Sequence, residues 1–469
     1  MVYEAKISDA FSEIPITESV GKNCERENNL KKLLICSQSH NVHGGVENII
    51  NDLCLELPGR GWETLLALGK GARYNDIAKY RNQYPNIPII EIDGTKGTRQ
   101  SRVESLVKII KQIKPDIVLS ARLFDAYAAM NKLKKRNRKL YFAVTVQSYE
   151  PPYFYDINLF RKTVDLCITS GNMIKQGIIH QSKLPANIVV SIPGGVRSPE
   201  KTVKPRSPGK TLRIGYVGRL EQEQKRISDL IPLLQALDRE CLFYQFDIVG
   251  TGPAEDRLKK KLKQWINVGS VVFHGWQEQS ELYNKFYPAM DCLVHFAHTE
   301  GVTIAPREAM VHGVVPIISQ FTGLKTEGHF LHNINALTFP VGDIDTAIAN
   351  IKRLITEPEL MNFLSSNAMR SQAGVYSFEG SMDAWAQALD ECVRQPPMPE
   401  MKKKPTLPPD GRLTQYGFSP WLAQRIRDFC SKRFVHSDPG SEWPTNSGMM
   451  TQEAQADILR FAKNYEKKL

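Results

Sequence analysis

The sequence predicts an α/β protein with two doubly wound parallel sheets that face a cleft, followed by a helical tail. Short apolar runs alternate with segments whose apolar residues repeat at helical spacing, first up to residue 196 and again over 211–395. Such alternation indicates βαβ units, in which strands are parallel and helices cover both faces of the sheet. At 469 residues the chain is also too long for one ordinary core.

This pattern divides the chain into five segments. Residues 1–28 hold acids throughout and lack the apolar stretch of a secretory signal, so we expect a loose extension. Residues 29–196 and 211–395 are the two predicted Rossmann-like domains, and 197–210, rich in proline, serine and charge, is the predicted linker. Residues 396–469 start with a Pro-rich stretch and continue with two predicted helices, "PWLAQRIRDFCSKRF" and "TQEAQADILRFAKNYEKKL".

The composition excludes several classes of protein. A hydrophobic fraction of 42% with 24% charged residues is typical of globular proteins. No apolar run approaches the ~20 residues that a membrane helix needs. The eight cysteines form no CxxC pair, and several lie inside strand-like runs. They favour buried, reduced thiols and a cytoplasmic location over disulfides or zinc.

Lysine and arginine are in excess and give a net charge of +11, concentrated in basic runs at 132–139, 258–263 and 402–405. Each run by itself is most simply a solvated helix face or loop. Because the runs lack interleaved aromatics and a helix-turn-helix pattern, we do not expect a nucleic acid as partner. A nucleotide, a phosphate-bearing substrate, or peripheral contact of the basic runs with an acidic membrane surface stays open.

Two glutamates, Glu300 and Glu308, flank a short apolar run in "HTEGVTIAPREAM". The run follows the predicted buried strand "DCLVHFA", and Pro306 suits the first turn of the next helix. The segment therefore lies beyond a strand's carboxyl end, where α/β sheets bind ligands. A helix N-terminus favours an anion, and carboxylates accept hydrogen bonds from hydroxyls. Glu300 could thus hold a hexose and Glu308 a ribose, although an acidic loop residue and an ordinary first-turn glutamate explain the pattern equally well.

Two other segments offer groups for a diphosphate. In "IGYVGRLEQEQKRISDL", Arg219 follows a predicted strand and Lys225 comes six residues later. Fixed cations there would stabilise a diphosphate leaving group without a metal, although each alone fits a surface charge. In "HGGVEN", Gly44 and Gly45 separate a strand from a helix, where backbone N–H groups can approach a phosphate. Any tight turn would also use such a pair.

Taken in this order and spacing, the three segments resemble the retaining GT-B glycosyltransferases of family 4. The matching features are the GGxE loop, "GRL" with a lysine six residues after the arginine, "VGTGP", "FHGW", and two glutamates eight apart followed by "EAMVHGVVPIIS". The resemblance covers about residues 31 to 395. As an ensemble these motifs are specific, whereas no single one is.

The resemblance implies a metal-independent hexosyltransferase with GT-B architecture. It would move a sugar from a nucleoside-diphosphate sugar to a hydroxyl of a small molecule, a lipid or a polysaccharide, without any other cofactor. Arg219 and Lys225 would bind the diphosphate, and Glu300 would hold the sugar. The remaining implied donor-site residues are Gly44, Gly45, Gly301, Val302, Thr303 and, on the ribose, Glu308.

The sequence departs from the family pattern at two places. Tyr149 in "QSYEPP" stands where family members often carry a histidine of a "HEP"-like stretch. Pro306 and Arg307 replace a more usual apolar pair, so we expect an added charge at the donor site. These departures keep a second hypothesis open, a non-catalytic nucleotide-sugar-binding or scaffold protein with the same two domains.

A metal site is not expected. His295 and His298 lie three residues apart without a third ligand at zinc spacing, and His295 falls inside a buried-strand pattern. "GDIDT" resembles a DxD metal motif, but Asp345 there suits a helix cap. The nucleotide base, the sugar and the acceptor are not determined by these patterns.

Overall fold

The computed structural model describes residues 30–38, 45–71, 77–134, 139–207, 209, 211–399, 401, 405–436 and 443–468. The extension expected at residues 1–28 and Gly44 of the GG loop lie outside the described residues. Within the described part, none of the helices has the length and hydropathy to cross a membrane.

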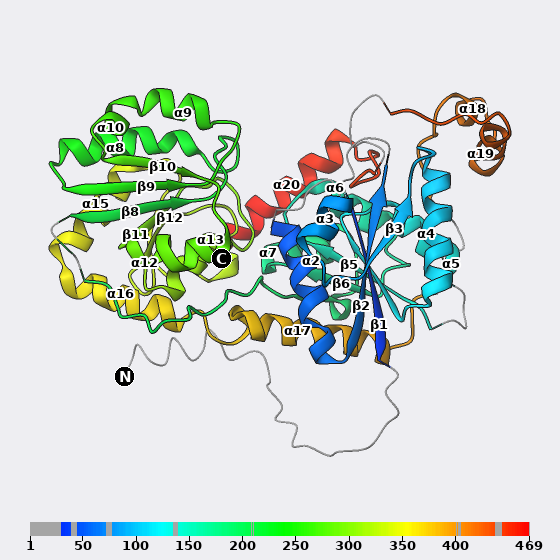
Figure 1. The fold of residues 1–469 in the computed structure, drawn as a ribbon, viewed down its shortest axis with the longest axis horizontal. Helices are drawn as coiled ribbons and strands as arrows, with labels where there is room; N and C mark the ends of the chain where they lie inside the picture. The colour runs from blue at the N-terminus through cyan, green and yellow to red at the C-terminus, as the bar shows by residue number, and fades with distance from the viewer. Residues whose placement is uncertain are drawn as a thin grey trace, which may run out of the picture. The chain divides into compact units, whose positions relative to one another are not determined.

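The described residues of the first lobe form a sheet of seven parallel strands in the order β3-β2-β1-β4-β5-β6-β7 (Figure 1). The strands are β1 (Lys31–Ser37), β2 (Trp62–Lys70), β3 (Ile89–Asp93), β4 (Ile117–Ala121), β5 (Tyr141–Val146), β6 (Leu166–Thr169) and β7 (Val189–Ser191). The helices between them are α2 (Gly45–Glu56), α3 (Ile77–Gln83), α4 (Arg99–Ile113), α5 (Asp125–Leu133), α6 (Pro151–Leu159) and α7 (Asn172–Gln181). Because β1 pairs with both β2 and β4, the strand order reverses beside β1.

The second lobe repeats this plan with six parallel strands in the order β10-β9-β8-β11-β12-β13 (Figure 1). The strands are β8 (Leu212–Val217), β9 (Tyr244–Val249), β10 (Val271–Gly275), β11 (Cys292–His295), β12 (Val315–Ser319) and β13 (Leu337–Phe339). The helices include α8 (Leu230–Arg239), α9 (Glu255–Lys261), α10 (Lys263–Asn267), α12 (Tyr287–Ala289), α13 (Ile304–Val311), α15 (Ile344–Thr356) and α16 (Pro358–Arg370). The predicted pair of doubly wound parallel sheets is confirmed.

The strands are apolar on both faces because helices flank each sheet. Leu33, Leu34 and Ile35 in β1 are all fully buried, and they divide between two core clusters. A strand with one solvated face would instead alternate apolar and polar residues. This explains why short continuous apolar runs were the signal for these strands.

The cap of α15 differs from the sequence expectation. Asp343, not Asp345, is the N-cap, and its side chain accepts a hydrogen bond from the backbone N–H of Thr346 at 3.0 Å. Asp345 lies in the first turn, where its negative charge interacts favourably with the positive end of the helix dipole. The general interpretation of this motif as a helix start holds, but the residue that caps was wrong.

Helix α17 (Phe378–Arg394) packs on the first sheet, although the sequence assigned residues up to 395 to the second domain. Phe378, Trp385 and Leu389 share one buried cluster with Leu33 and Ile35. The apolar spacing of this helix predicts its buried face correctly but does not identify the sheet that it covers. By its packing, the second lobe ends with α16.

The connection between the sheets is bound to the second lobe. The guanidinium of Arg206 donates to the carbonyl oxygens of Pro288 at 2.9 Å and of Tyr287 and His312 at 3.1 Å. Residues 197–207, together with Gln279 and Tyr283, line a cavity of about 700 Å³. This part of the predicted linker therefore has a defined path.

The tail is helical, as predicted, with α18 (Arg412–Gln415), α19 (Pro420–Phe429) and α20 (Gln452–Glu466). Helix α20 packs against α6 and α7, and α19 packs against α4. These described parts of the tail are therefore docked on the first lobe.

Candidate active site

The loops that follow β8 and β11 meet at the carboxyl edge of the second sheet, because these two strands are neighbours. The backbone N–H of His298 donates to the carbonyl oxygen of Gln224 at 2.9 Å. The Gln224 side chain donates in return to the carbonyl oxygen of Thr299 at 3.2 Å. Two segments that lie about 75 residues apart along the chain therefore form one surface.

Lys225 and Glu300 form an ion pair on this surface. The Glu300 side chain is only 9% exposed, and burial alone would raise its pKa. The positive charge of Lys225 outweighs that effect, so the pKa of Glu300 lies below its usual value. Glu300 is thus a carboxylate at neutral pH and can accept hydrogen bonds from hydroxyls. The two residues that the sequence singled out for sugar and diphosphate lie in direct contact.

Arg219 lies exposed at the carboxyl end of β8. Its backbone is held in place, because its carbonyl oxygen accepts a hydrogen bond from the Tyr216 hydroxyl at 2.9 Å. Its guanidinium makes no hydrogen bond or ion pair with any residue that the structure describes. Arg219 therefore presents an uncommitted cation from a fixed point on the same edge as Lys225.

Glycines of "GRL" and "VGTGP" allow the loops after β8 and β9 to approach each other. A side chain at Gly250 would overlap the carbonyl oxygen of Gly218, and one at Gly252 would overlap that of Leu220. Gly250 also has φ 129°, which favours glycine. The close approach brings the Leu220 N–H to the Thr251 carbonyl oxygen at 2.9 Å and fixes the loop that carries Arg219.

Helix α13 begins at Ile304, four residues after Glu300, and presents its N-terminus at this edge. Thr303 is the N-cap and makes no side-chain cap bond, and its buried hydroxyl has no hydrogen-bond partner among the described residues. The backbone N–H groups of Gly301 and Val302 likewise donate to no described residue. Free N–H groups at a helix start are suited to an anion or an electronegative oxygen.

Glu308 lies in the second turn of α13 and is buried, with only 5% of its surface exposed. One of its carboxylate oxygens accepts from the Gln279 amide at 2.7 Å and the other from the Tyr287 hydroxyl at 2.8 Å. Burial raises the pKa of Glu308 despite these bonds and the charge of Arg307. Each oxygen keeps a lone pair for a further donor such as a ribose hydroxyl.

Arg307 does not add a charge to the donor site, contrary to the sequence expectation. Its guanidinium is fully buried and donates to the Gln372 side chain at 2.9 Å, to the Tyr376 carbonyl oxygen at 2.8 Å and to the Gly194 carbonyl oxygen. Helical spacing explains this, because Arg307 and Glu308 are adjacent and therefore point in different directions. Arg307 binds the two chain segments that connect the lobes.

Two described positions of the first lobe bear on the sequence expectations, Gly45 and Tyr149. Gly45 begins α2, and no described atom lies within 4 Å of where a side chain would start. Tyr149, at the position of the expected histidine, donates its hydroxyl to the carbonyl oxygen of Ile458 in α20 at 3.1 Å. Its ring packs on Phe154 with centroids 4.6 Å apart. The Tyr149 hydroxyl is thus occupied by the tail.

A tail segment, residues 443–447, crosses the carboxyl ends of the first-lobe strands. The Trp443 ring packs against Gly69 and Gly94, at the ends of β2 and β3, where a side chain on either glycine would come within 2.6 Å of it. Its carbonyl oxygen accepts a hydrogen bond from Gln38, which follows β1. The Pro444 carbonyl oxygen accepts from the Phe124 N–H at 3.3 Å.

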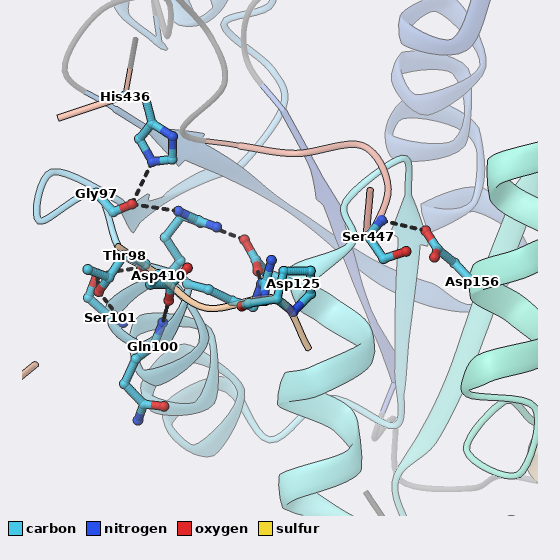
Figure 2. Close-up of polar contacts among 12 residues, drawn as sticks. Gly97, Thr98, Gln100, Ser101, Asp125, Asp156, Asp410, His436 and Ser447 are labelled. Atoms are coloured by element: carbon cyan, nitrogen blue, oxygen red, sulfur yellow. Dashed lines mark hydrogen bonds and ion pairs between the residues drawn. The ribbon is translucent and has the colours of Figure 1, made fainter. Parts of the chain in front are cut away.

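Figure 2 shows the far end of this segment, where the Ser447 N–H donates to Asp156 at 2.8 Å. The other carboxylate oxygen of Asp156 is buried and has no partner among the described residues. It lines a small cavity with Arg122, Tyr153 and Thr445. Burial raises the pKa of Asp156 to about 6. Sequence reasoning missed this contribution, and the only signal for it is an isolated tryptophan in a polar, Pro-containing stretch.

The tail also reaches the second lobe. Glu466, at the end of α20, accepts a hydrogen bond from the backbone N–H of Gly323. Gly323 lies against the backbone of Glu300, whose N–H donates to the neighbouring Thr322 carbonyl oxygen. The C-terminal helix therefore supports the loop that carries a candidate catalytic residue.

Metal-ligating side chains do not cluster in the part of the chain that the structure describes. His295 lies on β11 and is 2% exposed. Its Nε2 atom lies 3.6 Å from Glu300, too far for a hydrogen bond. Burial lowers the pKa of His295, so this histidine is neutral beside the carboxylate.

Comparisons with known proteins bear on the fold and on the second lobe. Residues 198–371 match the family model of glycosyl transferases group 1. No curated protein sequence matches the chain. In fold, the chain is similar to the lipopolysaccharide outer core galactosyltransferase WaaB, with TM-score 0.60 and 17% identity over 77% of this chain and 99% of that one.

Two further solved structures are similar. For HepE of Anabaena in complex with UDP, the TM-score is 0.62 and the identity 16%, over 77% of this chain and 100% of that one. For sucrose-phosphate synthase from Thermosynechococcus elongatus, the values are 0.62 and 17%, over 78% and 99%. The chain therefore has the GT-B fold, and its second lobe matches the glycosyl transferases group 1 over residues 198–371.

Proposed function

We propose that the protein is a retaining, metal-independent glycosyltransferase that moves a hexose from a nucleoside-diphosphate sugar to an acceptor hydroxyl. The observation that carries this proposal is the cluster at the carboxyl edge of the second sheet. It joins the free guanidinium of Arg219, the Lys225–Glu300 ion pair and the open N-terminus of α13. Cations, a buried carboxylate and free N–H groups are the partners that a diphosphate-linked sugar needs.

The Lys225–Glu300 pair indicates how the donor would bind. A diphosphate next to Lys225 and Arg219 would share their charge, and the sugar hydroxyls would donate to Glu300. Negative charge grows on the diphosphate as the glycosidic bond breaks, so fixed cations stabilise the transition state more than the ground state. Glu308 would take the ribose through its remaining lone pairs.

Retention follows from attack on the face that the diphosphate leaves. The acceptor oxygen bonds to the anomeric carbon while the bond from that carbon to the phosphate oxygen breaks. The departing phosphate oxygen takes the acceptor's proton, which leaves a nucleoside diphosphate and a glycoside. This route needs neither a metal nor a protein base, which fits a site where the Tyr149 hydroxyl is already bound to the tail.

A second candidate function is a nucleotide-sugar-binding or scaffold protein without transfer activity. The observation that favours it is the engagement of Tyr149 with Ile458 in place of the histidine expected in the family. Both candidates predict donor binding, and only the first predicts turnover.

The experiment is a thermal-shift screen of UDP-, GDP- and ADP-sugars, followed by an assay of sugar release or transfer with the donors that bind. A ligand at one hundred times its Kd raises the unfolding free energy by about 2.7 kcal/mol. UDP-sugars come first because HepE was solved with UDP. Turnover that persists with a chelator present supports the proposal, and binding without turnover supports the second candidate. If no nucleotide sugar binds, both are wrong.

A further inference from the structure

The hairpin of α18 and α19, residues 410–436, turns six of its large apolar side chains to solvent, whereas Leu413, Ile426 and Phe434 are partly buried. The exposed large apolar side chains are Tyr416 (78%), Phe418 (42%), Trp421 (54%), Leu422 (40%), Phe429 (92%) and Val435 (72%). The residues that α19 buries are the small Ala423 and the polar Gln424. A helix on the surface of a globular protein normally buries its large apolar side chains and exposes its polar ones. A patch of this kind marks an interaction site.

Polar contacts anchor the hairpin to the first lobe, so its exposed face is not a consequence of a loose tail. Gln424 accepts a hydrogen bond from Thr98 at the start of α4. Asp428 pairs with Lys96 at 2.8 Å. Figure 2 shows the contact of the His436 ring with the Gly97 carbonyl oxygen, at 2.7 Å.

Figure 2 also shows the second acid of the hairpin, Asp410, which accepts a hydrogen bond from the Gln100 N–H at 3.3 Å. Asp410 and Asp428 are the only acids of residues 410–436, and both face the first lobe. The polar contacts thus use the inner face and leave the aromatic face outward.

The outer face is positively charged. Arg412, Arg425, Lys432 and Arg433 are exposed, and none of them forms an ion pair with a described residue. Arg425 lies over the Trp421 ring, 5.5 Å from its centroid. Exposed aromatics and aliphatics beside uncompensated cations are typical of helices that lie in the interface of an anionic bilayer.

We propose that residues 410–436 bind the surface of an anionic lipid bilayer. Trp421, Leu422 and Phe429 would enter the interface, and Arg425 and Arg433 would contact lipid headgroups. Pairing of this face with the same face of a second copy is unfavourable, because the exposed cations of the two copies would repel each other. Leu422 and Val435 cannot stack on bases, which favours lipid over single-stranded nucleic acid. The contact would rest on this hairpin instead of on basic runs such as 258–263.

The test is co-sedimentation of the full chain with phosphatidylcholine vesicles, with and without phosphatidylglycerol. We expect binding only with the anionic lipid, and weaker binding at high salt. R425Q/R433Q should weaken it roughly 25-fold, at about fivefold for each cation. W421S/F429S should weaken it about tenfold or more, because both side chains would leave the interface.

Matched controls come from the second lobe. F243S/V268S removes two exposed apolar side chains there, and K260Q/K261Q removes two exposed cations of α9. Both should bind like the unchanged chain. F429S alone, at the most exposed of these positions, guards against a folding defect in the double variant, and unchanged thermal unfolding confirms each variant's fold.

Equal binding of the hairpin variants and the controls would overturn the proposal, as would binding to neutral vesicles alone. Absence of vesicle binding would do the same. Self-association or binding to a single-stranded oligonucleotide that W421S/F429S abolishes, without vesicle binding, would identify a different partner and also refute it.

Discussion

At the scale of single residues, Lys225 and Glu300 show how the site combines charge and burial. Glu300 is nearly buried, and an unpaired carboxylate there would be costly. The charge of Lys225 offsets that cost, and in the proposed function the same ammonium group would meet a diphosphate. The pair therefore keeps an ionised carboxylate at the same sheet edge as the exposed cation Arg219, where the proposed donor would meet both.

Replacing Arg219 by alanine should lower kcat by a hundred- to thousandfold, about 2.7–4 kcal/mol, because the variant lacks a cation at the developing diphosphate charge. The control is Arg213→Ala, which removes an exposed arginine near the opposite end of the same strand. Steady-state kinetics with the best donor measure both variants. Equal kcat in the two variants would contradict the assigned role of Arg219.

Asp156 provides a pH test of the tail contact. Its folded-state pKa of about 6 exceeds the ordinary 3.8, so the folded protein holds this proton more tightly than the unfolded chain. This contribution to stability is fully present below about pH 4 and is lost as the pH rises through about 6. The difference between the two pKa values corresponds to about 3 kcal/mol of unfolding free energy.

Asp156→Asn keeps an acceptor for the Ser447 N–H and removes the charge. We expect its thermal midpoint to match that of the unchanged chain near pH 4 and to exceed it at pH 8. Asp256→Asn, at an exposed carboxylate of α9 that pairs with no described residue, is the control and should not change the pH dependence. Parallel curves for Asp156→Asn and the unchanged chain would show that the buried carboxylate is not the cause.

At the scale of elements, the sequence was most informative where the pattern was local. The strands of both sheets and the amphipathic helices followed from apolar spacing, and the strand-end loops followed from strand positions. The predicted cap of α15 was two positions wrong, because Asp343 and Asp345 lie two residues apart and only backbone geometry selects between them. The sequence placed α17 in the second domain, but the helix packs on the first sheet. The apolar face of a helix does not determine which sheet it will cover.

The segment 443–447 depends on one large side chain. Trp443→Ala removes a tryptophan that is 2% exposed, which costs about 3–5 kcal/mol for a buried aromatic. We expect the tail to detach and to be cleaved faster in limited proteolysis, with cleavage sites after residue 400. Trp276→Ala, at a half-exposed tryptophan of the second lobe, should leave the proteolysis rate unchanged. Unchanged cleavage of Trp443→Ala would show that the other contacts suffice to hold the tail.

At the scale of the whole molecule, the two lobes differ in whether their core residues come from one continuous stretch of the chain. The main core cluster of the second lobe lies entirely within residues 212–364. The core of the first lobe draws on α17 and on Trp443 and Ile458 of the tail. The first lobe is therefore completed by residues from the far end of the sequence.

Expression of the lobes as fragments tests this difference. Residues 197–373 should be soluble and unfold cooperatively on heating. Residues 30–196 alone should aggregate, because Trp385, Leu389 and their neighbours would be missing from the core. Co-expression with residues 374–468 should restore a soluble first lobe. A stable fragment 30–196 would contradict the proposed dependence on α17.

The sequence by itself determined the two parallel sheets, their helices and the motifs at the strand ends, because these depend on residues close together in the chain. The tertiary structure decided the ion pair of Lys225 with Glu300, the inward turn of Arg307, and the docking of α17 and the tail on the first lobe. Those contacts join residues that are far apart in sequence. Their partners are chosen by shape and burial across the whole fold, and no local pattern of residue types carries that information.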